Sequence, residues 1–284
     1  MAQLLEGKPL ADKIKEEIRQ EVQSLKRKAV LASVQVGENP GAEAYVKSQK
    51  KVAESLGIEY AFHKLGQETN EGQLIAFIQK LNQDKAVNGI IIQMPLPAQI
   101  DYKRISQHIS WEKDVEGMHP ANIGKIVFGR GRLFPCTPLA VMELLQESGI
   151  NLNGKETVIV GHSEIVGKPL ALLLLDKFAT VTVCHIGTSQ AGKLEEHVRR
   201  AEVLIVAVGR AGLIKGAWVK EGAVVIDVGI NRVGDKIVGD IEFEEAKMRA
   251  SWITPVPGGV GPLTVTMLMR NLLEATKLQQ GKGD

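Results

Sequence analysis

The 284-residue sequence predicts an α/β protein of two domains, each built on a parallel sheet with helices on both faces. Its length exceeds the ~100–200 residues of one typical domain. Short apolar runs rich in β-branched residues alternate with segments in which apolar residues recur every three or four positions. This alternation is typical of consecutive βαβ units, and runs that are apolar throughout are typical of strands buried on both faces.

The first series of elements runs from residue 9 to residue 93. Pro9 opens an amphipathic segment, as expected for the first turn of a helix. The turn residues Asn39-Pro40-Gly41 precede a second helical segment, and Gly57 ends it. The predicted order is helix 9–28, strand 29–36, helix 42–56, strand 58–64, helix 70–82 and strand 87–93.

A second series follows the loop-rich stretch 114–138. It predicts helix 138–148, strand 156–160, helix 169–175, strands 180–185, 203–208 and 223–228, and a last helix 264–278. We therefore expect the boundary between the two domains near residue 120.

Composition excludes several classes of protein. Net charge is +2, and the short basic clusters 26–28 and 50–51 are typical of solvated helix faces rather than of a nucleic-acid site. Two cysteines, Cys136 and Cys184, argue against a disulfide framework. The sequence has no signal-peptide pattern and no apolar run of ~18 residues. We expect a cytoplasmic protein without a membrane or nucleic-acid partner, and the six histidines show no metal-ligand spacing.

Residues 157–169, TVIVGHSEIVGKP, combine a strand, a glycine turn and a helix start. Such a turn lets backbone N–H groups approach a pyrophosphate at a helix N-terminus. A P-loop is excluded, because Gly161 and Gly167 are one residue too far apart and Pro169 replaces the required Ser or Thr. A dinucleotide-binding turn of variant form and an ordinary βα connection remain as interpretations.

The end of the following strand carries the usual signal for the choice of dinucleotide. An acidic residue there is typical of NAD sites, and a nearby arginine of NADP sites. The segment 184–188, CHIGT, contains neither, so the choice between NAD and NADP stays open.

Six segments in family order resemble the bifunctional methylenetetrahydrofolate dehydrogenase/methenyltetrahydrofolate cyclohydrolase family. They are GIIIQMPLP (89–97), KDVEGMHP (113–120), PCTP (135–138), GHSEIVGKP (161–169), VIDVGIN (225–231) and ITPVPGGVGP (253–262). The resemblance implies an N-terminal three-layer α/β domain (1–119), a Rossmann-like NAD(P)-binding domain (120–263), and a last helix (264–284) that returns to the first domain. It also implies a homodimer, a folate substrate, and a role in one-carbon metabolism and purine biosynthesis.

The resemblance assigns catalytic positions to Tyr45, Gln49, Gln93 and Glu116. In the family, a Tyr-x-x-x-Lys pair directs both side chains at the folate from one helix face. Tyr45 matches the tyrosine, but Gln49 stands in place of the lysine, and Ala42 replaces a frequent serine. Gln93 matches a glutamine that assists the lysine. Glu116 replaces the second aspartate of the family's Lys-Asp-Val-Asp-Gly, which binds the pterin edge.

Further positions follow from the same matches. Folate contacts are expected at Tyr45, Gln93, Pro95, Glu116, Pro257, Gly258 and Gly259. Dinucleotide contacts are expected at Gly161, His162, Ser163, Ile165, Val166, Gly167, His185, Ile186, Thr188, Gly209 and Ile230.

The two family reactions make different demands on these residues. Hydride transfer needs only placement of the reactants, because a nitrogen lone pair stabilises the cation that forms. Hydrolysis of the methenyl product needs proton transfer, which the Gln49 amide cannot perform. The sequence predicts a dehydrogenase whose cyclohydrolase activity is weak or absent, unless Lys51, or a water held by Gln93 and Glu116, substitutes. A dehydrogenase of another small substrate and a folate-binding non-enzyme are the alternatives.

Overall fold

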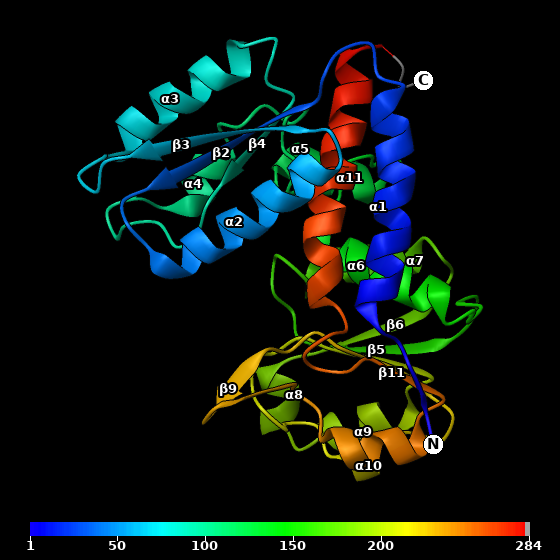
Figure 1. The fold of residues 1–284 in the computed structure, drawn as a ribbon. Coiled ribbons are helices and arrows are strands. Elements are labelled where there is room, and N and C mark those ends of the chain that lie inside the picture. The colour runs from blue at the N-terminus through cyan, green and yellow to red at the C-terminus, as the bar shows by residue number, and fades with distance from the viewer. Residues whose placement is uncertain (282–284) are drawn as a thin grey trace. The chain divides into compact units, whose positions relative to one another are not determined.

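The computed structural model describes residues 1–281 of the chain, which form two compact units (Figure 1). Unit 1 contains Met1–Asp12 and Thr137–Thr264, and unit 2 contains Lys13–Cys136 and the chain from Val265 onward. Each unit has its own parallel sheet and its own apolar core, which confirms the expected α/β fold class. Residues 282–284 of the expected C-terminal segment lie outside the described residues.

The boundaries between the two units lie after residues 12, 136 and 264, whereas the sequence predicted one near residue 120. The strand β1 (Gln3–Leu4) pairs in parallel with β11 (Trp252–Ile253), and this pairing places the N-terminus in unit 1. The helix α5 (Pro120–Val127) belongs to unit 2, where Asn122 Nδ2 donates to Asp114 Oδ2 at 2.9 Å. Residues 120–136, expected in the dinucleotide-binding domain, therefore pack with unit 2.

Unit 2 is built on a three-stranded parallel sheet in the order β3-β2-β4. Its strands are β2 (Val30–Val36), β3 (Glu59–Leu65) and β4 (Gly89–Ile92). Its helices are α1 (Gly7–Gln23), which begins in unit 1, α2 (Pro40–Ser55), α3 (Glu71–Gln83), α4 (Tyr102–Ser106), α5 and most of α11 (Gly261–Gln279). Figure 1 shows α2 and α3 on opposite faces of this sheet.

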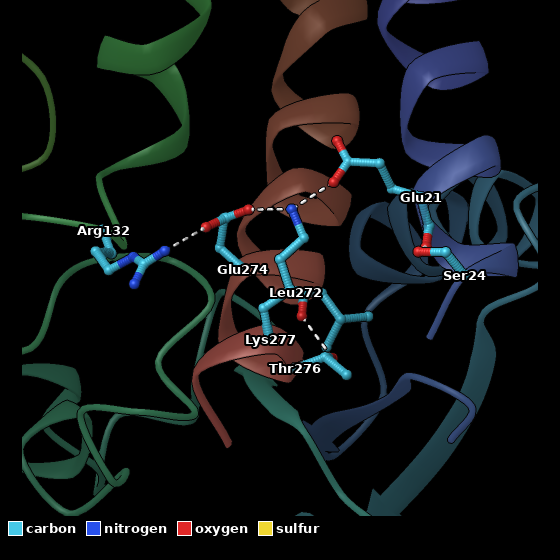
Figure 2. A network of polar contacts seen from close by, with 7 residues as sticks. All are labelled: Glu21, Ser24, Arg132, Leu272, Glu274, Thr276 and Lys277. Carbon is cyan, nitrogen blue, oxygen red and sulfur yellow. Dashed lines mark hydrogen bonds and ion pairs between the residues drawn. The ribbon is translucent and has the colours of Figure 1, made fainter. Parts of the chain in front are cut away.

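The last helix is anchored in unit 2 by a network of charges (Figure 2). Lys277 Nζ of α11 forms ion pairs with Glu21 of α1 and, at 2.8 Å, with Glu274. Arg132 approaches the same Glu274 carboxylate at 3.6 Å. Burial opposes the charge of Lys277, but the hydrogen bonds to Glu21 and Glu274 outweigh it and raise the pKa of the lysine. The expected return of this helix to the first domain is confirmed.

Unit 1 contains a six-stranded parallel sheet in the order β1-β11-β8-β7-β5-β6. Its other strands are β5 (Glu156–Val160), β6 (Thr180–Cys184), β7 (Val203–Val206) and β8 (Val224–Asp227). Its helices are α6 (Cys136–Glu147), α7 (Gly167–Leu175), α8 (Ile186–Gln190), α9 (Leu194–Arg200), the 3₁₀ helix η1 (Gly216–Trp218) and α10 (Phe243–Arg249). A separate antiparallel hairpin joins β9 (Asn231–Val233) to β10 (Lys236–Val238).

The strand order of unit 1 creates a switch point beside β5. The chain passes from β5 to β6 on one side and then returns to β7 on the other. In open parallel sheets, ligands bind at the carboxyl ends of strands on either side of such a point. Among the described residues, no helix combines the length and apolar character needed to cross a membrane.

Candidate active site

The glycine turn after β5 is shaped by close backbone contacts. Gly161 has φ of 128°, and a Cβ atom there would lie 2.3 Å from the carbonyl oxygen of Ala207, just beyond β7. A Cβ at Gly167, the first residue of α7, would lie 2.0 Å from the carbonyl oxygen of Gly161. Both contacts are shorter than a side chain permits. The two glycines therefore bring the start of α7 and the end of β7 against one turn.

Ser163 supports this turn from within. Its Oγ accepts a hydrogen bond from the Val166 amide at 3.1 Å, and its carbonyl oxygen accepts one from the Lys168 amide at 3.0 Å. Val166 stands at the N-cap of α7 but provides no side-chain cap. The amides of Val166 and Lys168 are therefore occupied within the turn, and Pro169 has no N–H group. The close approach of the glycine turn, rather than a row of free helix N–H groups, shapes this edge of the site.

A cavity of about 380 Å³ opens beside the turn, a volume within the range of small-ligand sites. It is lined by Val160, Gly161, His162, Ser163, His185, Ile186, Ser189, Leu194, Ala207, Val208, Arg210 and Leu213. The lining thus combines the ends of β5, β6 and β7, which flank the switch point. No aspartate or glutamate is among these residues, so the wall favours an anionic or neutral ligand over a cation.

The expected dinucleotide contacts divide into two groups. Gly161, His162, Ser163, His185 and Ile186 line the cavity. Ile165, Val166, Gly167, Thr188, Gly209 and Ile230 do not line it, although most of them belong to its supporting turns. Sequence analysis missed the wall formed by Ala207, Val208 and Arg210. These residues directly follow the strand 203–206, and that position at the carboxyl end of a neighbouring strand was the available signal.

Two histidines border the cavity. The rings of His162 and His185 have their centroids 5.2 Å apart. His185 Nδ1 accepts from the Gly187 amide at 3.1 Å, while the His185 amide donates to Thr188 Oγ1 at 3.2 Å. His185 thereby caps α8, and Thr188 supports the site from outside the cavity.

The expected folate residues of unit 2 begin on α2. Asn39 caps this helix by accepting from the Ala42 amide, and Pro40 occupies its first turn. Tyr45 and Gln49 are four residues apart, so they share one helix face. The Tyr45 side chain is 43% exposed, whereas Gln49 is completely buried.

Gln49 is held by side chains from the sheet below it. The Tyr60 hydroxyl and Gln93 Nε2 both donate to Gln49 Oε1, each at 2.8 Å. Gln93 Nε2 also donates to Ser33 Oγ at 3.0 Å. Side chains alternate along strands, and the register places Ser33 and Tyr60 on the face that α2 covers. Burial raises the pKa of Tyr60 to about 12, so its hydroxyl remains a donor at neutral pH.

This arrangement fixes the direction of the Gln49 amide. Its oxygen is saturated by two donors, while its Nε2 is buried and has no hydrogen-bond partner in the described part of the chain. A buried donor without an acceptor costs about 1–3 kcal/mol, which an acceptor on a ligand or a water recovers. The site therefore presents a neutral N–H donor where the resemblance expects a lysine.

Glu116 has an environment that disfavours its charge. Burial, and then the nearby Asp114 carboxylate, raise the pKa of Glu116 to about 7, although the hydroxyl of Tyr102 donates to Glu116 Oε2 at 3.1 Å. Asp114 is itself buried, and it accepts from the His119 amide at 2.7 Å and from Asn122 at 2.9 Å. Glu116 is therefore poised to gain or lose a proton near neutral pH.

The remaining folate positions lie on two separate turns. Pro95 is exposed on the turn after β4 in unit 2. Pro257, Gly258 and Gly259 belong to unit 1, where the Gly7 amide donates to the Gly258 carbonyl oxygen at 2.8 Å. The structure thus brings Gln49 and Gln93 into direct contact, and adds Ser33 and Tyr60, which sequence analysis missed.

Comparison with known proteins identifies the family. Residues 5–116 match the catalytic domain of tetrahydrofolate dehydrogenase/cyclohydrolase, and residues 135–280 match its NAD(P)-binding domain. Over 281 residues the chain is 51% identical to the bifunctional protein FolD of Pelobacter propionicus, with 98% of each chain covered.

Solved structures agree with this match. The bifunctional enzyme FolD, methylenetetrahydrofolate dehydrogenase/cyclohydrolase, from Campylobacter jejuni superposes with a TM-score of 0.94 at 45% identity, covering 98% of this chain and 99% of that one. The Trypanosoma brucei methylenetetrahydrofolate dehydrogenase-cyclohydrolase complexed with NADP cofactor and inhibitor superposes with a TM-score of 0.91 at 36% identity, covering 98% of each chain. The resemblance inferred from the sequence is confirmed: the chain belongs to the tetrahydrofolate dehydrogenase/cyclohydrolase family.

Proposed function

We propose that the protein is a 5,10-methylenetetrahydrofolate dehydrogenase, which transfers a hydride from the folate-bound methylene carbon to NAD⁺ or NADP⁺ and forms 5,10-methenyltetrahydrofolate. The observation that carries this proposal is the turn in which Gly161 meets Ala207 and Gly167, beside a cavity at the switch point of a parallel sheet. Production of reduced nicotinamide from methylenetetrahydrofolate, measured with each dinucleotide, tests it. Folate binding without reduction of either dinucleotide would contradict it.

In this reaction the residues of the site position the folate and the dinucleotide, and none of them acts as an acid or a base. The dinucleotide supplies the hydride acceptor, and the glycine turn at Gly161 and Gly167 permits the close backbone approach that its pyrophosphate needs. On the folate side, Tyr45 offers an exposed ring for stacking, and Gln49 Nε2 offers a buried hydrogen-bond donor. The hydride step requires no proton transfer. Its rate therefore depends mainly on how the protein positions and orients the two reactants.

We infer further that the cyclohydrolase activity is weak. An amide does not exchange protons at neutral pH, and the Gln49 amide is held by Tyr60 and Gln93. Lys51 is exposed and lies two residues further along α2, about 200° around the helix from Gln49. Glu116, another of the expected folate residues, is suited to slow proton transfer, since its pKa is raised to about 7.

Glu116 gives the proposed folate site a dependence on pH. A carboxylate accepts hydrogen bonds from the pterin edge, and the neutral acid accepts fewer. Because the pKa of Glu116 is raised to about 7, we expect the KM for methylenetetrahydrofolate to rise as pH falls from 8 to 6, by up to about tenfold. Glu116→Gln should have a raised KM without this dependence, and Glu112→Gln, which changes an exposed neighbour, should retain it. An unchanged pH profile in Glu116→Gln would exclude this role.

The residues that line the cavity also bear on the choice between NAD⁺ and NADP⁺. His162, Ile186 and Gly187 stand at the positions where family members commonly hold the 2′-phosphate, so we expect a preference for NADP⁺ of less than about a hundredfold, or ~2.7 kcal/mol. Arg210 is the one arginine among the lining residues. Arg210→Ala should therefore lower kcat/KM for NADP⁺ about tenfold, as for one lost charge-assisted hydrogen bond, and lower it less for NAD⁺. An equal loss for both dinucleotides would show that Arg210 does not contact the 2′-phosphate.

We also propose that the enzyme is a cytoplasmic homodimer. The β9–β10 hairpin of unit 1 exposes the apolar side chains of Val233 and Ile237, which favours contact with another protein surface. Light scattering should give the mass of a dimer for the wild-type protein and a lower mass for Ile237→Asp. A wild-type mass equal to one chain at micromolar concentration would contradict the proposal.

A further inference from the structure

Asp240 carries a fully buried carboxylate that no part of the proposed mechanism uses. Its Oδ2 accepts from the amides of Val208 and Gly209, at 2.7 and 3.0 Å. Its Oδ1 accepts from the amide of Arg210 at 2.7 Å and from Asn231 Nδ2 at 2.8 Å. Three consecutive backbone N–H groups thus converge on one carboxylate, a geometry known from anion-binding turns.

The backbone that Asp240 holds is a wall of the nucleotide cavity. Val208, Gly209 and Arg210 begin two residues after the end of β7 and lie outside any regular element. Their amides are bonded by the Asp240 carboxylate instead of by a sheet or helix. Val208 and Arg210 line the cavity of about 380 Å³. The Asp240 carboxylate therefore lies behind this wall, and the hydrogen bonds that it accepts fix the backbone conformation of the wall.

A second carboxylate holds Asp240 in place. Asp227, at the end of β8, accepts from the amides of Asp240 and Ile241 at 3.0 and 2.9 Å, and from the Gly229 amide at 2.9 Å. Its own amide donates to Thr254 Oγ1 at 2.7 Å. The end of β8 is thereby linked through Asp240 to the turn that follows β7.

Glycines make room for both carboxylates. A Cβ atom at Gly229 would lie 2.2 Å from Asp240 Cγ, and a Cβ at Gly239 would lie 2.0 Å from Asp227 Oδ2. Burying a charge is costly, and hydrogen bonds from neutral amides, most of them from the backbone, lower that cost. For Asp227 they do not cancel it, because burial still raises the pKa of this carboxyl to about 6. Two glycines and two buried acidic residues together therefore stabilise the conformation of one short turn.

We propose that Asp240 is a positioning residue for the dinucleotide: its carboxylate sets the backbone of Val208, Gly209 and Arg210, and through it the cavity wall. The inference rests on the proposed dehydrogenase function. The affinities for NAD⁺ and NADP⁺ should both depend on Asp240, because both dinucleotides contact this wall. Folate binding in unit 2 should not depend on Asp240.

Asp240→Asn tests the inference with little change in shape. An amide keeps one acceptor oxygen and turns an N–H₂ group toward backbone donors, so one half of the turn loses its partner. We expect the dissociation constants of NAD⁺ and NADP⁺, measured by calorimetry, to rise by about tenfold or more. The KM for both dinucleotides should rise with them, while kcat and the KM for methylenetetrahydrofolate change by less than about twofold.

A purely structural role must be distinguished from positioning. Val225→Ala, in the buried strand β8, removes core volume from the same sheet without touching the turn and serves as the control for lost stability. Asn231→Ala removes one neutral donor to Asp240 and should weaken both dinucleotides by a smaller factor, which keeps the inference testable if Asp240→Asn fails to fold. Dinucleotide affinity that falls no more in the Asp240 and Asn231 variants than in Val225→Ala would overturn the inference. If the wild-type protein itself binds neither dinucleotide, the proposed function fails first, and the two outcomes are thereby distinguishable.

Discussion

A Gln49→Lys variant is expected to hydrolyse 5,10-methenyltetrahydrofolate about 10²–10⁴-fold faster than the wild-type protein, which is the usual contribution of a general acid–base group. The lysine would replace an amide that already lies against Tyr60 and Gln93, so its amine would enter an existing polar network. An ammonium group has only donors, and Gln93 must therefore turn its oxygen toward it while the Tyr60 hydroxyl accepts. The decay of the methenyl absorbance band, with and without protein, measures the effect.

The control for the faster hydrolysis is a variant that replaces a lysine outside the Gln49 network. Lys51→Gln removes an exposed lysine from the same helix and should leave both activities unchanged. Tyr60→Phe combined with Gln49→Lys should recover less hydrolysis, because one partner of the new amine is lost. Rapid methenyl hydrolysis by the wild-type protein would show instead that Glu116 or a water replaces the missing lysine.

A Gly161→Ala variant is expected to lose dinucleotide binding by about a hundredfold or more. The added methyl group would lie 2.3 Å from the Ala207 carbonyl oxygen, at a backbone φ of 128° that residues with a side chain rarely adopt. Relief requires separation of the β5 turn from the end of β7, and both line the cavity. Calorimetric titration with NADP⁺ and NAD⁺ measures the loss.

Gly154→Ala separates backbone strain from this steric contact. Gly154 also has a positive φ, of 73°, but a Cβ atom there would meet nothing within 4 Å. It precedes β5 in the same unit and should cost stability without changing dinucleotide affinity. Similar losses of affinity in the two variants would assign the effect to destabilisation of the sheet rather than to the turn.

Local patterns in the sequence were sufficient for part of the site. Gly161 and Gly167 could be assigned to a βα turn because strand, glycines and helix start are contiguous. Gln49 and Tyr45 could be paired because helix periodicity brings residues four apart onto one face. Each of these inferences needs only the period of one element and the residues at its ends.

Contacts between distant segments could not be inferred in this way. Tyr60 reaches Gln49, and Ser33 reaches Gln93, only through the register of β2 against its neighbours β3 and β4, which no local pattern encodes. Asp240 reaches the turn after β7 from beyond the β9–β10 hairpin, which sequence analysis did not predict. The pairing of β1 with β11 likewise joins the first residues to a segment near the other end of the chain.

A single reaction of the wild-type protein with 5,10-methylenetetrahydrofolate and NADP⁺ or NAD⁺ shows whether it transfers hydride without rapidly hydrolysing the product. Nicotinamide fluorescence would report the reduced dinucleotide, and the methenyl absorbance band would report the folate product. A dehydrogenase with Gln49 in place of the lysine should form the two products in equal amounts, and the methenyl compound should then decay at a rate close to its rate in buffer alone. Absence of reduced dinucleotide with both acceptors would contradict the dehydrogenase function. Formation of reduced dinucleotide while the methenyl compound is hydrolysed as fast as it appears would contradict the weak cyclohydrolase activity.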